Sequence, residues 1–340
     1  MLAATTFRRT PFRGLRRLDI SRDLRDIAGL IDEAFGAEPD QAGQAVASEF
    51  RALSWWGPLL RGLDILSLGG DAFTGFVWVE EGRVVGNVTL SRENFAPGRW
   101  MISNVVVAEP YRRRGISRQL IQASLDFLRK KRARQAFLMV RRENLAAMRL
   151  YEALGFNEVG GRATLRRESP PRPVAEAALE SGWTLRDATF RDGRGLSELA
   201  RAATPQAMQQ IQPVQPEAWA SEADGDPGGW ILALLGKKRS RRWVLEEQGR
   251  ILAYIRLDVS RRKYHRLRFV AHPAVRGRVE QAMIGRALGL LHGAAALPVL
   301  ADVGTEECAA IDVLQARGFA ASRWLIVLAR RMDVELNAEE

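Results

Sequence analysis

Three consecutive arginines, Arg112, Arg113 and Arg114, stand directly before Gly115 and follow an apolar run at residues 105–107. A strand that turns into a helix here would present unpaired helix N–H groups and the positive end of the helix dipole to an anion. Glycine lets an anion approach the backbone without a Cβ in the way. The stretch therefore predicts a pyrophosphate site, and a solvated helix start with favourable surface charge is the alternative.

The elements around this turn must hold it rigidly. The helix predicted from residue 116 has apolar residues at helical spacing, namely Ile116, Leu120, Ala123 and Phe127. That face would pack on a sheet and fix the helix N-terminus beside the strand end. A buried strand at 136–140 and a short helix at 144–154 follow, and Gly155 and Phe156 close the helix. The predicted order is strand, turn, helix, strand, helix.

Residues 112–117 resemble the phosphate loop of the GNAT N-acetyltransferases, Gln/Arg-x-x-Gly-x-Gly/Ala, with the small Ser117 in the last position. The family's second signature is an asparagine, a tyrosine seven residues later and then a Gly-Phe pair. The sequence is similar to it at Asn144, Tyr151, Gly155 and Phe156. The resemblance extends over about residues 14–166 and implies an N-acetyltransferase.

The resemblance implies acetyl-CoA as acyl donor and a primary amine as acceptor, either a small molecule or a protein N-terminus or lysine. Loop amides would hold the pyrophosphate, and the splayed strand edge would pair with the pantetheine amides, where an N–H polarises the thioester carbonyl. Tyr151 would be catalytic and protonate the departing thiolate. Asn144 would orient the CoA arm. The implied cofactor-binding residues are Val105, Val106, Val107, Arg112, Arg113, Arg114, Gly115, Ile116, Ser117, Arg118 and Asn144.

Two of these residues also have a structural interpretation. Asn144 stands where a helix N-cap is expected, and Tyr151 could be a packing residue of an amphipathic helix. The general base is not assigned. The ribosomal-protein alanine acetyltransferases of this family have a glutamate five residues before the signature asparagine, and Met139 occupies that position here. Glu93, Asp71 or a chain of waters could serve instead, or the substrate amine could arrive already neutral.

Composition limits the other classes of function. The single cysteine, Cys308, excludes an internal disulfide framework, and the three scattered histidines predict no metal cluster. No run of eighteen apolar residues is present to span a membrane, and the basic residues 1–14 lack the apolar segment of a secretory signal. We therefore expect a cytoplasmic protein. The net charge of +11 is spread over both halves without a nucleic-acid motif, so no specific nucleic-acid partner is expected.

The first half of the chain recurs in the second. A Pro-rich linker is predicted at 167–182, and beyond it four residues repeat at a constant offset of 163: Pro110 as Pro273, Ala147 as Ala310, Gly155 as Gly318 and Phe156 as Phe319. The predicted domains are 14–166 and 183–334. We expect a tandem of α/β domains, each a mixed, mainly antiparallel twisted sheet flanked by helices, with a splayed parallel strand pair in the first.

The second copy has lost the motif residues. At this offset the counterparts of Arg112, Gly115, Ser117, Asn144 and Tyr151 are Val275, Arg278, Glu280, Glu307 and Leu314. Arg276 and Gly277 lie near the turn, and a one-residue slip of the alignment would restore part of the motif. The second domain is therefore predicted to be a degenerate acetyltransferase-like domain.

Paired tryptophans, Trp55 and Trp56, border the acceptor cleft or fill the core. An acyl-CoA sensor that turns over slowly or not at all is the alternative function, and a basic RNA-associated protein is a third. The oligomeric state is left open.

Overall fold

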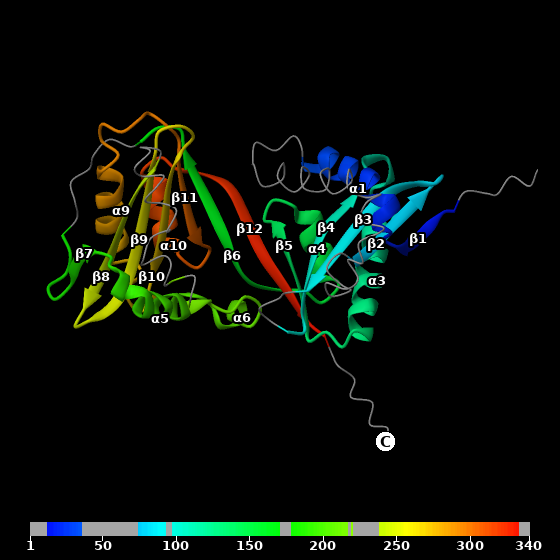
Figure 1. The fold of residues 1–340 in the computed structure, drawn as a ribbon, viewed down its shortest axis with the longest axis horizontal. Helices are drawn as coiled ribbons and strands as arrows, with labels where there is room; N and C mark the ends of the chain where they lie inside the picture. The colour runs from blue at the N-terminus through cyan, green and yellow to red at the C-terminus, as the bar shows by residue number, and fades with distance from the viewer. Residues whose placement is uncertain are drawn as a thin grey trace, which may run out of the picture. The chain divides into compact units, whose positions relative to one another are not determined.

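The computed structural model describes residues 12–35, 74–92, 97–170, 178–216, 219 and 238–332. The chain divides into two compact units. The first comprises residues 1–138, 149–157 and 329–340, and the second comprises residues 139–148 and 158–328. Each unit has its own strands and helices (Figure 1), so each is described separately.

The sheet of the first unit has the strand order β1-β2-β3-β4-β5. Strands β1 to β4 pair antiparallel, and β4 and β5 pair in parallel. The elements in chain order are β1 (Gly14–Arg17), α1 (Ile20–Phe35), β2 (Thr74–Glu80), β3 (Arg83–Arg92), β4 (Arg99–Val107), α3 (Ile116–Lys130), β5 (Gln135–Arg141) and α4 (Leu145–Glu152). The last two elements cross the boundary between the units.

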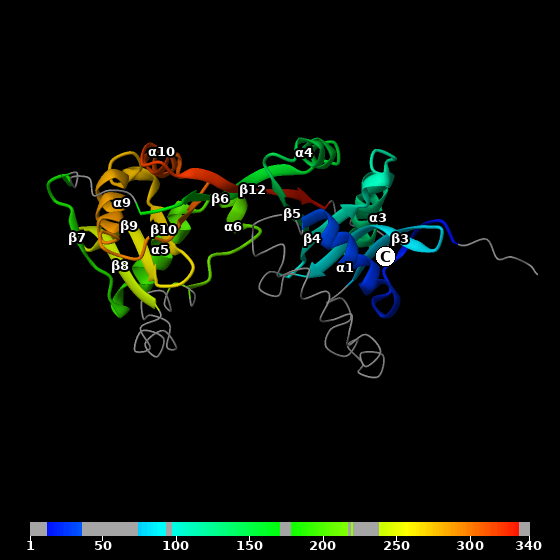
Figure 2. The same cartoon turned by 90° about the horizontal axis from the view of Figure 1, so that it is seen from above.

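Helices α1 and α3 cover opposite faces of this sheet (Figure 2). In β2, Val77 packs in one core cluster with the buried residues of α1, whereas the ring of Phe76 meets Phe127 of α3 at 6.2 Å between centroids. Side chains of successive strand residues point to opposite faces. Gly86 of β3 lets α3 approach closely, because a Cβ there would lie 3.1 Å from a methyl group of Ile116. This contact positions the start of α3.

The sheet of the second unit has the order β12-β6-β11-β10-β9-β8-β7. Strands β10 and β11 are parallel, whereas β6 and β11, β9 and β10, β8 and β9, and β7 and β8 are antiparallel. The elements are β6 (Asn157–Arg167), β7 (Thr184–Asp187), α5 (Gly193–Ala203), α6 (Gln206–Gln209), β8 (Lys238–Glu247), β9 (Arg250–Ser260), β10 (His265–Ala271), α9 (Glu280–Gly289), β11 (Val299–Gly304), α10 (Cys308–Ala316) and β12 (Ala320–Arg331). Val244 packs with α5, and its neighbours on β8 pack in the cluster that contains α9 and α10.

The expected tandem of α/β domains is confirmed, and even the hairpin turns agree. Glu81 and Gly82 join β2 to β3 with φ of 49° and 81°, and Gln248 and Gly249 join β8 to β9 with the same two values. This is the turn geometry expected for a two-residue hairpin. In both units a parallel strand then leads through a 3₁₀ turn into a helix, a second parallel strand and a short helix.

The compact units differ from the predicted domains 14–166 and 183–334. Residues 158–166 belong to the second unit, where β6 pairs with β11 from Arg162 opposite Gly304 to Arg167 opposite Val299. Residues 329–340 belong to the first unit. Proline and charge composition predicts where a chain is extended, but pairing between strands more than 130 positions apart leaves no local signal. Of the predicted linker, residues 171–177 lie outside the described part of the chain.

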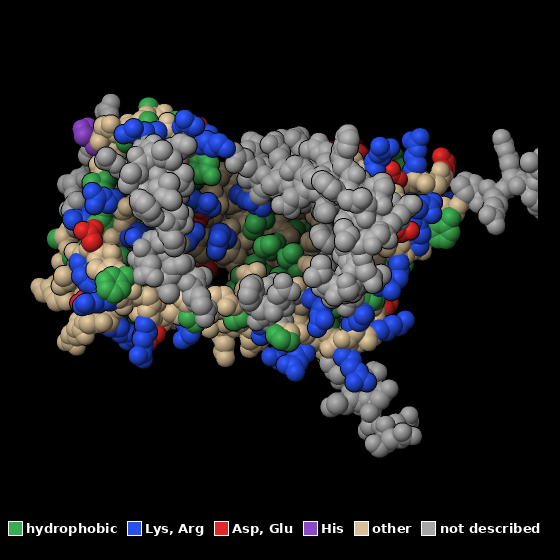
Figure 3. All heavy atoms as spheres, viewed as in Figure 1, with side chains coloured by type: hydrophobic (Ala, Val, Ile, Leu, Met, Phe, Trp, Pro, Cys, Tyr) green, Lys and Arg blue, Asp and Glu red, His purple; other side chains and the backbone are tan. Residues whose placement is uncertain are grey.

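Three further features concern helix hydrophobicity, potential metal ligands and surface charge. No helix in the described part of the chain is long and apolar enough to cross a membrane. Within the same residues no three His, Cys, Asp or Glu side chains gather as metal ligands would. Lys and Arg side chains are dispersed over the face shown in Figure 3 rather than gathered in one basic patch. Trp55, Trp56, Asp71 and Glu93 lie outside the described residues.

Candidate functional site

Strands β4 and β5 separate after a short parallel contact. They pair from Arg99 opposite Gln135 to Met101 opposite Phe137, and the register ends there. The other edge of β4 stays paired with β3 as far as Val107 opposite Gly86. The expected splayed pair is therefore present. Beyond Met101 the edge of β4 that faced β5 can bind an extended ligand that carries amide groups.

A β-bulge changes the direction of β4 at the start of the predicted binding residues 105–107. Asn87 lies opposite Val106 and Thr89 opposite Ser103, so two residues of β4 face one of β3. Asn104, in the bulge, has φ of 51°. The fully buried Asn87 donates a hydrogen bond from Nδ2 to the Asn104 carbonyl at 3.0 Å. The sequence analysis missed this support, and the signal that was available is an asparagine inside the apolar strand 84–90.

The turn between β4 and α3 forms an open cradle of backbone amides. Gly115 is the N-cap of α3 with φ of 77°, and no side chain caps the helix. The helix's first hydrogen bond runs from Gln119 N–H to the Gly115 carbonyl at 3.1 Å, so the amides of residues 116–118 precede it. A Cβ on Gly115 would meet no atom of the described residues within 4 Å. An anion can therefore reach these amides.

Two of the three arginines also hold the turn in shape. Arg112 donates from Nε to the Val107 carbonyl at 3.1 Å, and Arg114 donates from Nη2 to the Pro110 carbonyl at 2.9 Å. Arg113 has a left-handed backbone, with φ of 62°. All three side chains are exposed. Positive charge and turn geometry thus come from the same residues.

Tyr151 is a buried phenol in the same unit as the turn. Its side chain is 6% exposed, and burial raises its pKa to about 12. The ring meets Phe156 edge-on, with the centroids 6.0 Å apart. Phe156 N–H donates to the Tyr151 carbonyl at 3.0 Å, and Gly155 takes φ of 79°. The Gly-Phe pair therefore ends α4 and packs beside Tyr151.

Asn144 belongs to the second unit and has a clear structural contact. Its Oδ1 accepts a hydrogen bond from Ala147 N–H at 3.1 Å, which is an N-cap of α4. Met139, at the position of the family's glutamate, is 49% exposed in that unit. The structure thus places Val105 to Arg118 and Tyr151 in one compact unit and Asn144 in the other. A role of Asn144 in cofactor binding stays a prediction.

Asn144→Asp separates the two roles of this residue. Aspartate caps a helix about as well as asparagine but lacks the amide donor. If capping is the main role, Asn144→Asp keeps wild-type stability and wild-type KM for acetyl-CoA, while Asn144→Ala loses about 1 kcal/mol of unfolding free energy. Urea unfolding and steady-state kinetics measure both. A raised KM in the stable Asn144→Asp variant would show that the amide contacts the cofactor.

The corresponding turn of the second unit is shifted by one residue from the sequence alignment. The 3₁₀ turns span Glu109–Tyr111 and Pro273–Val275, and the helices begin at Ile116 and Glu280. Both comparisons give an offset of 164 rather than 163. Gly115 therefore corresponds to Val279 instead of Arg278, and Arg112 corresponds to Arg276 instead of Val275. The shifted stretch includes Pro110, which the 3₁₀ turns place opposite Ala274 rather than Pro273, so matching the two prolines concealed the shift.

Glu280 fills the amide cradle of this second turn. Its side chain is 1% exposed, and its carboxylate accepts hydrogen bonds from Gly277 N–H at 3.0 Å and Val279 N–H at 3.1 Å. The chain thus supplies its own anion where the first turn is open. The strand edge is also occupied, because Ala271 N–H, at the end of β10, donates to Oε1 of Glu307 at 3.1 Å.

The comparisons with known proteins agree with this geometry. The model of the acetyltransferase (GNAT) family matches residues 37–156. The chain is 43% identical over 68 residues to the ribosomal protein bS18 alanine N-acetyltransferase of Escherichia coli, which is 20% of this chain and 43% of that protein. It is 36% identical over 89 residues to the N-alpha-acetyltransferase RimI of Mycobacterium tuberculosis, or 26% of this chain and 54% of that protein. The chain thus spans about half the length of these curated relatives.

Two solved structures share the fold over nearly the whole chain. A GCN5-related N-acetyltransferase from Sphaerobacter thermophilus has a TM-score of 0.58 and 18% identity, covering 94% of this chain and 96% of that one. A tandem GNAT protein from the clavulanic acid biosynthesis pathway has a TM-score of 0.51 and 17% identity, covering 94% and 98%. At such identities these likenesses concern the fold.

Proposed function

We propose that this chain, in which residues 37–156 belong to the acetyltransferase (GNAT) family, transfers an acetyl group from acetyl-CoA to a primary amine by direct attack. The observation that carries the proposal is the turn at Gly115, next to strand β4, which within the described residues has no pairing with β5 beyond Met101. The test is release of CoA thiol when acetyl-CoA is offered with a panel of amines. Amine-dependent release supports the proposal, and binding of acetyl-CoA without release across the panel contradicts it.

The residues of the turn fit a pyrophosphate. No side chain caps α3, and the space beside Gly115 is open. The amides of residues 116–118 and the exposed charges of Arg112, Arg113 and Arg114 would hold the phosphates, while residues 105–107 would pair with the pantetheine amides. Acetyl-CoA would supply the acyl group as a thioester. The chain's part is to bind and orient it.

Tyr151 would hold the proton that the leaving thiolate needs. A pKa of about 12 means that the phenol stays protonated throughout the physiological range. Its burial keeps it away from bulk water, which would otherwise compete as the proton donor. The proposed catalytic and binding residues include no nucleophilic side chain paired with a base. The amine would therefore attack the thioester directly.

The acceptor is proposed only as a primary amine. Two relatives that the chain matches are described as N-terminal or ribosomal-protein alanine acetyltransferases, which makes a protein N-terminus one candidate class. The candidate bases Asp71 and Glu93 lie outside the described residues. A cytoplasmic location and the absence of a nucleic-acid partner stay predictions from the sequence.

One observation favours an acyl-CoA sensor as a second candidate. Met139 offers no proton acceptor at the position where the family's alanine acetyltransferases have a glutamate, and its side chain is 49% exposed. Replacing it with glutamate distinguishes the two functions. A slow enzyme that lacks a base would gain rate in Met139→Glu, whereas a sensor would keep its affinity for acetyl-CoA and show no turnover in either form.

The second unit is proposed to be inactive as a donor site. Glu280→Gly is expected to leave kcat within about twofold of wild type, because the phosphate turn and Tyr151 belong to the other unit. It removes the buried partner of two backbone N–H groups, and we expect a loss of about 1–3 kcal/mol in the free energy of unfolding. Kinetics and urea titration measure the two effects. A large loss of kcat in folded protein would mean that the second unit takes part in turnover.

A further inference from the structure

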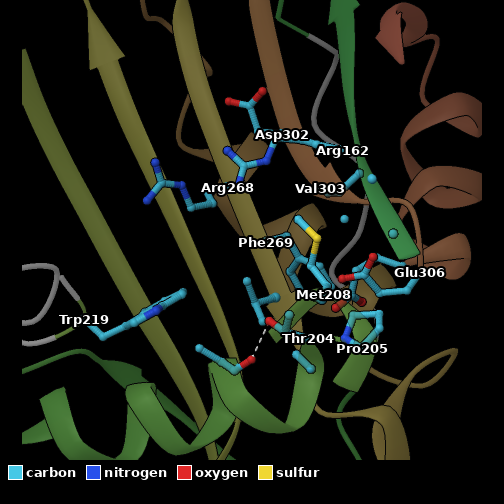
Figure 4. Close-up of a pocket in the computed structure, with 17 residues that line it drawn as sticks. Arg162, Thr204, Pro205, Met208, Trp219, Arg268, Phe269, Asp302, Val303 and Glu306 are labelled. Carbon is cyan, nitrogen blue, oxygen red and sulfur yellow. Dashed lines mark hydrogen bonds between the residues drawn. The ribbon is translucent and has the colours of Figure 1, made fainter. Parts of the chain in front are cut away.

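The second unit contains a cavity of about 250 Å³ that the proposed donor site does not use (Figure 4). Strands β10 and β11 pair in parallel as far as Arg268 opposite Asp302. Phe269, Val303 and Gly304, which follow, line the cavity, as do residues of β6, α5 and α6, of the segments after α5 and β11, and Trp219. The cavity thus begins where the parallel pairing of β10 and β11 ends, as the pairing of β4 and β5 ends at Met101.

Glu307 gives this cavity an acceptor oxygen that no described residue of the chain bonds. Its side chain is 2% exposed and lines the cavity. Oε1 accepts hydrogen bonds from Ala271 N–H and from Nη2 of Arg276, both at 3.1 Å. Oε2 is buried, and within the described residues it has no hydrogen-bond partner. A buried carboxylate oxygen without a donor is costly, so a donor from outside the chain would lower the free energy of this site.

A second carboxylate lines the same cavity. Glu306 folds back over Gly304, and Figure 4 shows it toward Met208 and Pro205, away from Arg268. Burial raises the pKa of Glu307, and the negative charge of Glu306 adds to that rise. A cation between the two carboxylates would relieve this repulsion.

The third acid of the cavity is already paired. Asp302 accepts hydrogen bonds from Oγ1 of Thr164 at 2.7 Å and from Nε of Arg266 at 2.5 Å. The acceptor capacity for a ligand is therefore concentrated at Glu306 and Glu307.

The remaining walls combine apolar surface with two arginines, Arg162 and Arg268. Phe269, Met208 and Trp219 contribute apolar surface. CoA does not suit this slot, because Ala271 N–H is bonded to Glu307 and the adjoining cradle of turn amides is filled by Glu280.

We propose that the cavity binds a small primary amine as its ammonium cation. The ammonium group donates to Oε2 of Glu307 with Glu306 beside it, and a short apolar body lies against Phe269 and Met208. The aromatic ring of Trp219 adds a surface that favours cations. This site is separate from the proposed acceptor site of the first unit and needs no acetyl-CoA.

Binding of 4-fluorobenzylamine to the full chain, followed by ¹⁹F NMR without acetyl-CoA, tests the proposal. The neutral 4-fluorobenzyl alcohol is the matched ligand. We expect the amine to bind at least about tenfold more tightly than the alcohol, and Glu307→Gln to weaken the amine at least about tenfold. Glu306→Gln should weaken it less. Glu158→Gln, which removes an exposed carboxylate of the same unit outside the lining, should change nothing.

These outcomes are independent of the proposed enzyme activity. Gly115→Glu should leave amine binding unchanged, since its turn belongs to the other unit, and a failed transfer assay would not alter the titration. Glu307→Gln keeps an acceptor for Ala271 N–H. If Glu307→Gln does not fold, Glu306→Gln provides the test. Equal affinity for amine and alcohol, undiminished binding in the folded glutamine variants, or no binding of the amine would each overturn the proposal.

Discussion

Gly115→Glu is expected to weaken acetyl-CoA binding by about 100-fold or more. The space beside Gly115 is open, so a side chain placed there enters the cradle where the phosphates would lie. A carboxylate among phosphates adds like-charge repulsion of several kcal/mol, which corresponds to two or more powers of ten in Kd. In the second unit a carboxylate is already present in the turn, because Glu280, the counterpart of Ile116, accepts hydrogen bonds from Gly277 N–H and Val279 N–H. Calorimetric titration measures the effect.

The control must reproduce the backbone strain of this substitution. Gly115 has φ of 77°, a conformation that any other residue adopts at a cost. Gly249 has φ of 81°, is equally free of neighbours and lies in a hairpin turn of the second unit. Gly249→Glu should therefore lose similar stability while keeping wild-type affinity for acetyl-CoA. If Gly115→Glu also kept that affinity, the phosphate assignment would be wrong.

Tyr151→Phe is expected to lower kcat by about 100-fold and to leave KM for acetyl-CoA nearly unchanged. The substitution removes only the hydroxyl, so the edge-on contact with Phe156 can persist. The expected loss is within the usual range for a missing general acid. Steady-state kinetics at saturating amine measure it. The result separates proton donation from packing, because a packing role would lower stability and leave kcat unchanged.

Tyr254→Phe is the matched control, since Tyr254 is also a fully buried tyrosine but belongs to the second unit. Its kcat should equal that of wild type. The pH profile gives a second check. With a pKa of about 12, Tyr151 should cause no fall in activity below about pH 11, so a tyrosine-dependent fall near pH 9 would contradict its protonated role.

Local sequence patterns predicted the parts of the fold that depend on neighbouring residues. The apolar run at 105–107, the turn at Gly115 and the Gly-Phe pair that ends α4 each have a short-range cause. Each appears where expected. The apolar face of α3 was predicted less well. Ile116 and Leu120 are buried, but Phe127 is half-buried, and Ile121, Ser124, Leu125 and Leu128 complete the buried face.

Long-range pairing decided what the sequence could not show. The partner of β6 is β11, whose residues follow by more than 130 positions, and no composition or motif encodes that choice. The bulge at Asn104 depends on a hydrogen bond from Asn87, a residue of the neighbouring strand. Glu307 stood out as the counterpart of Asn144, but its contact with Ala271 and its unused oxygen emerge only from the folded chain.

The number of acetyl-CoA molecules bound per chain tests the central claim most directly. The first unit has an open cradle at Gly115, and the second has a cradle filled by Glu280 and a strand edge bonded to Glu307. Calorimetric titration of acetyl-CoA into the full chain should therefore give one site, lost in Gly115→Glu and kept in Glu280→Gly. Two sites in the wild-type protein, or one site that survives in Gly115→Glu, would contradict the assignment of the first unit as the only donor site.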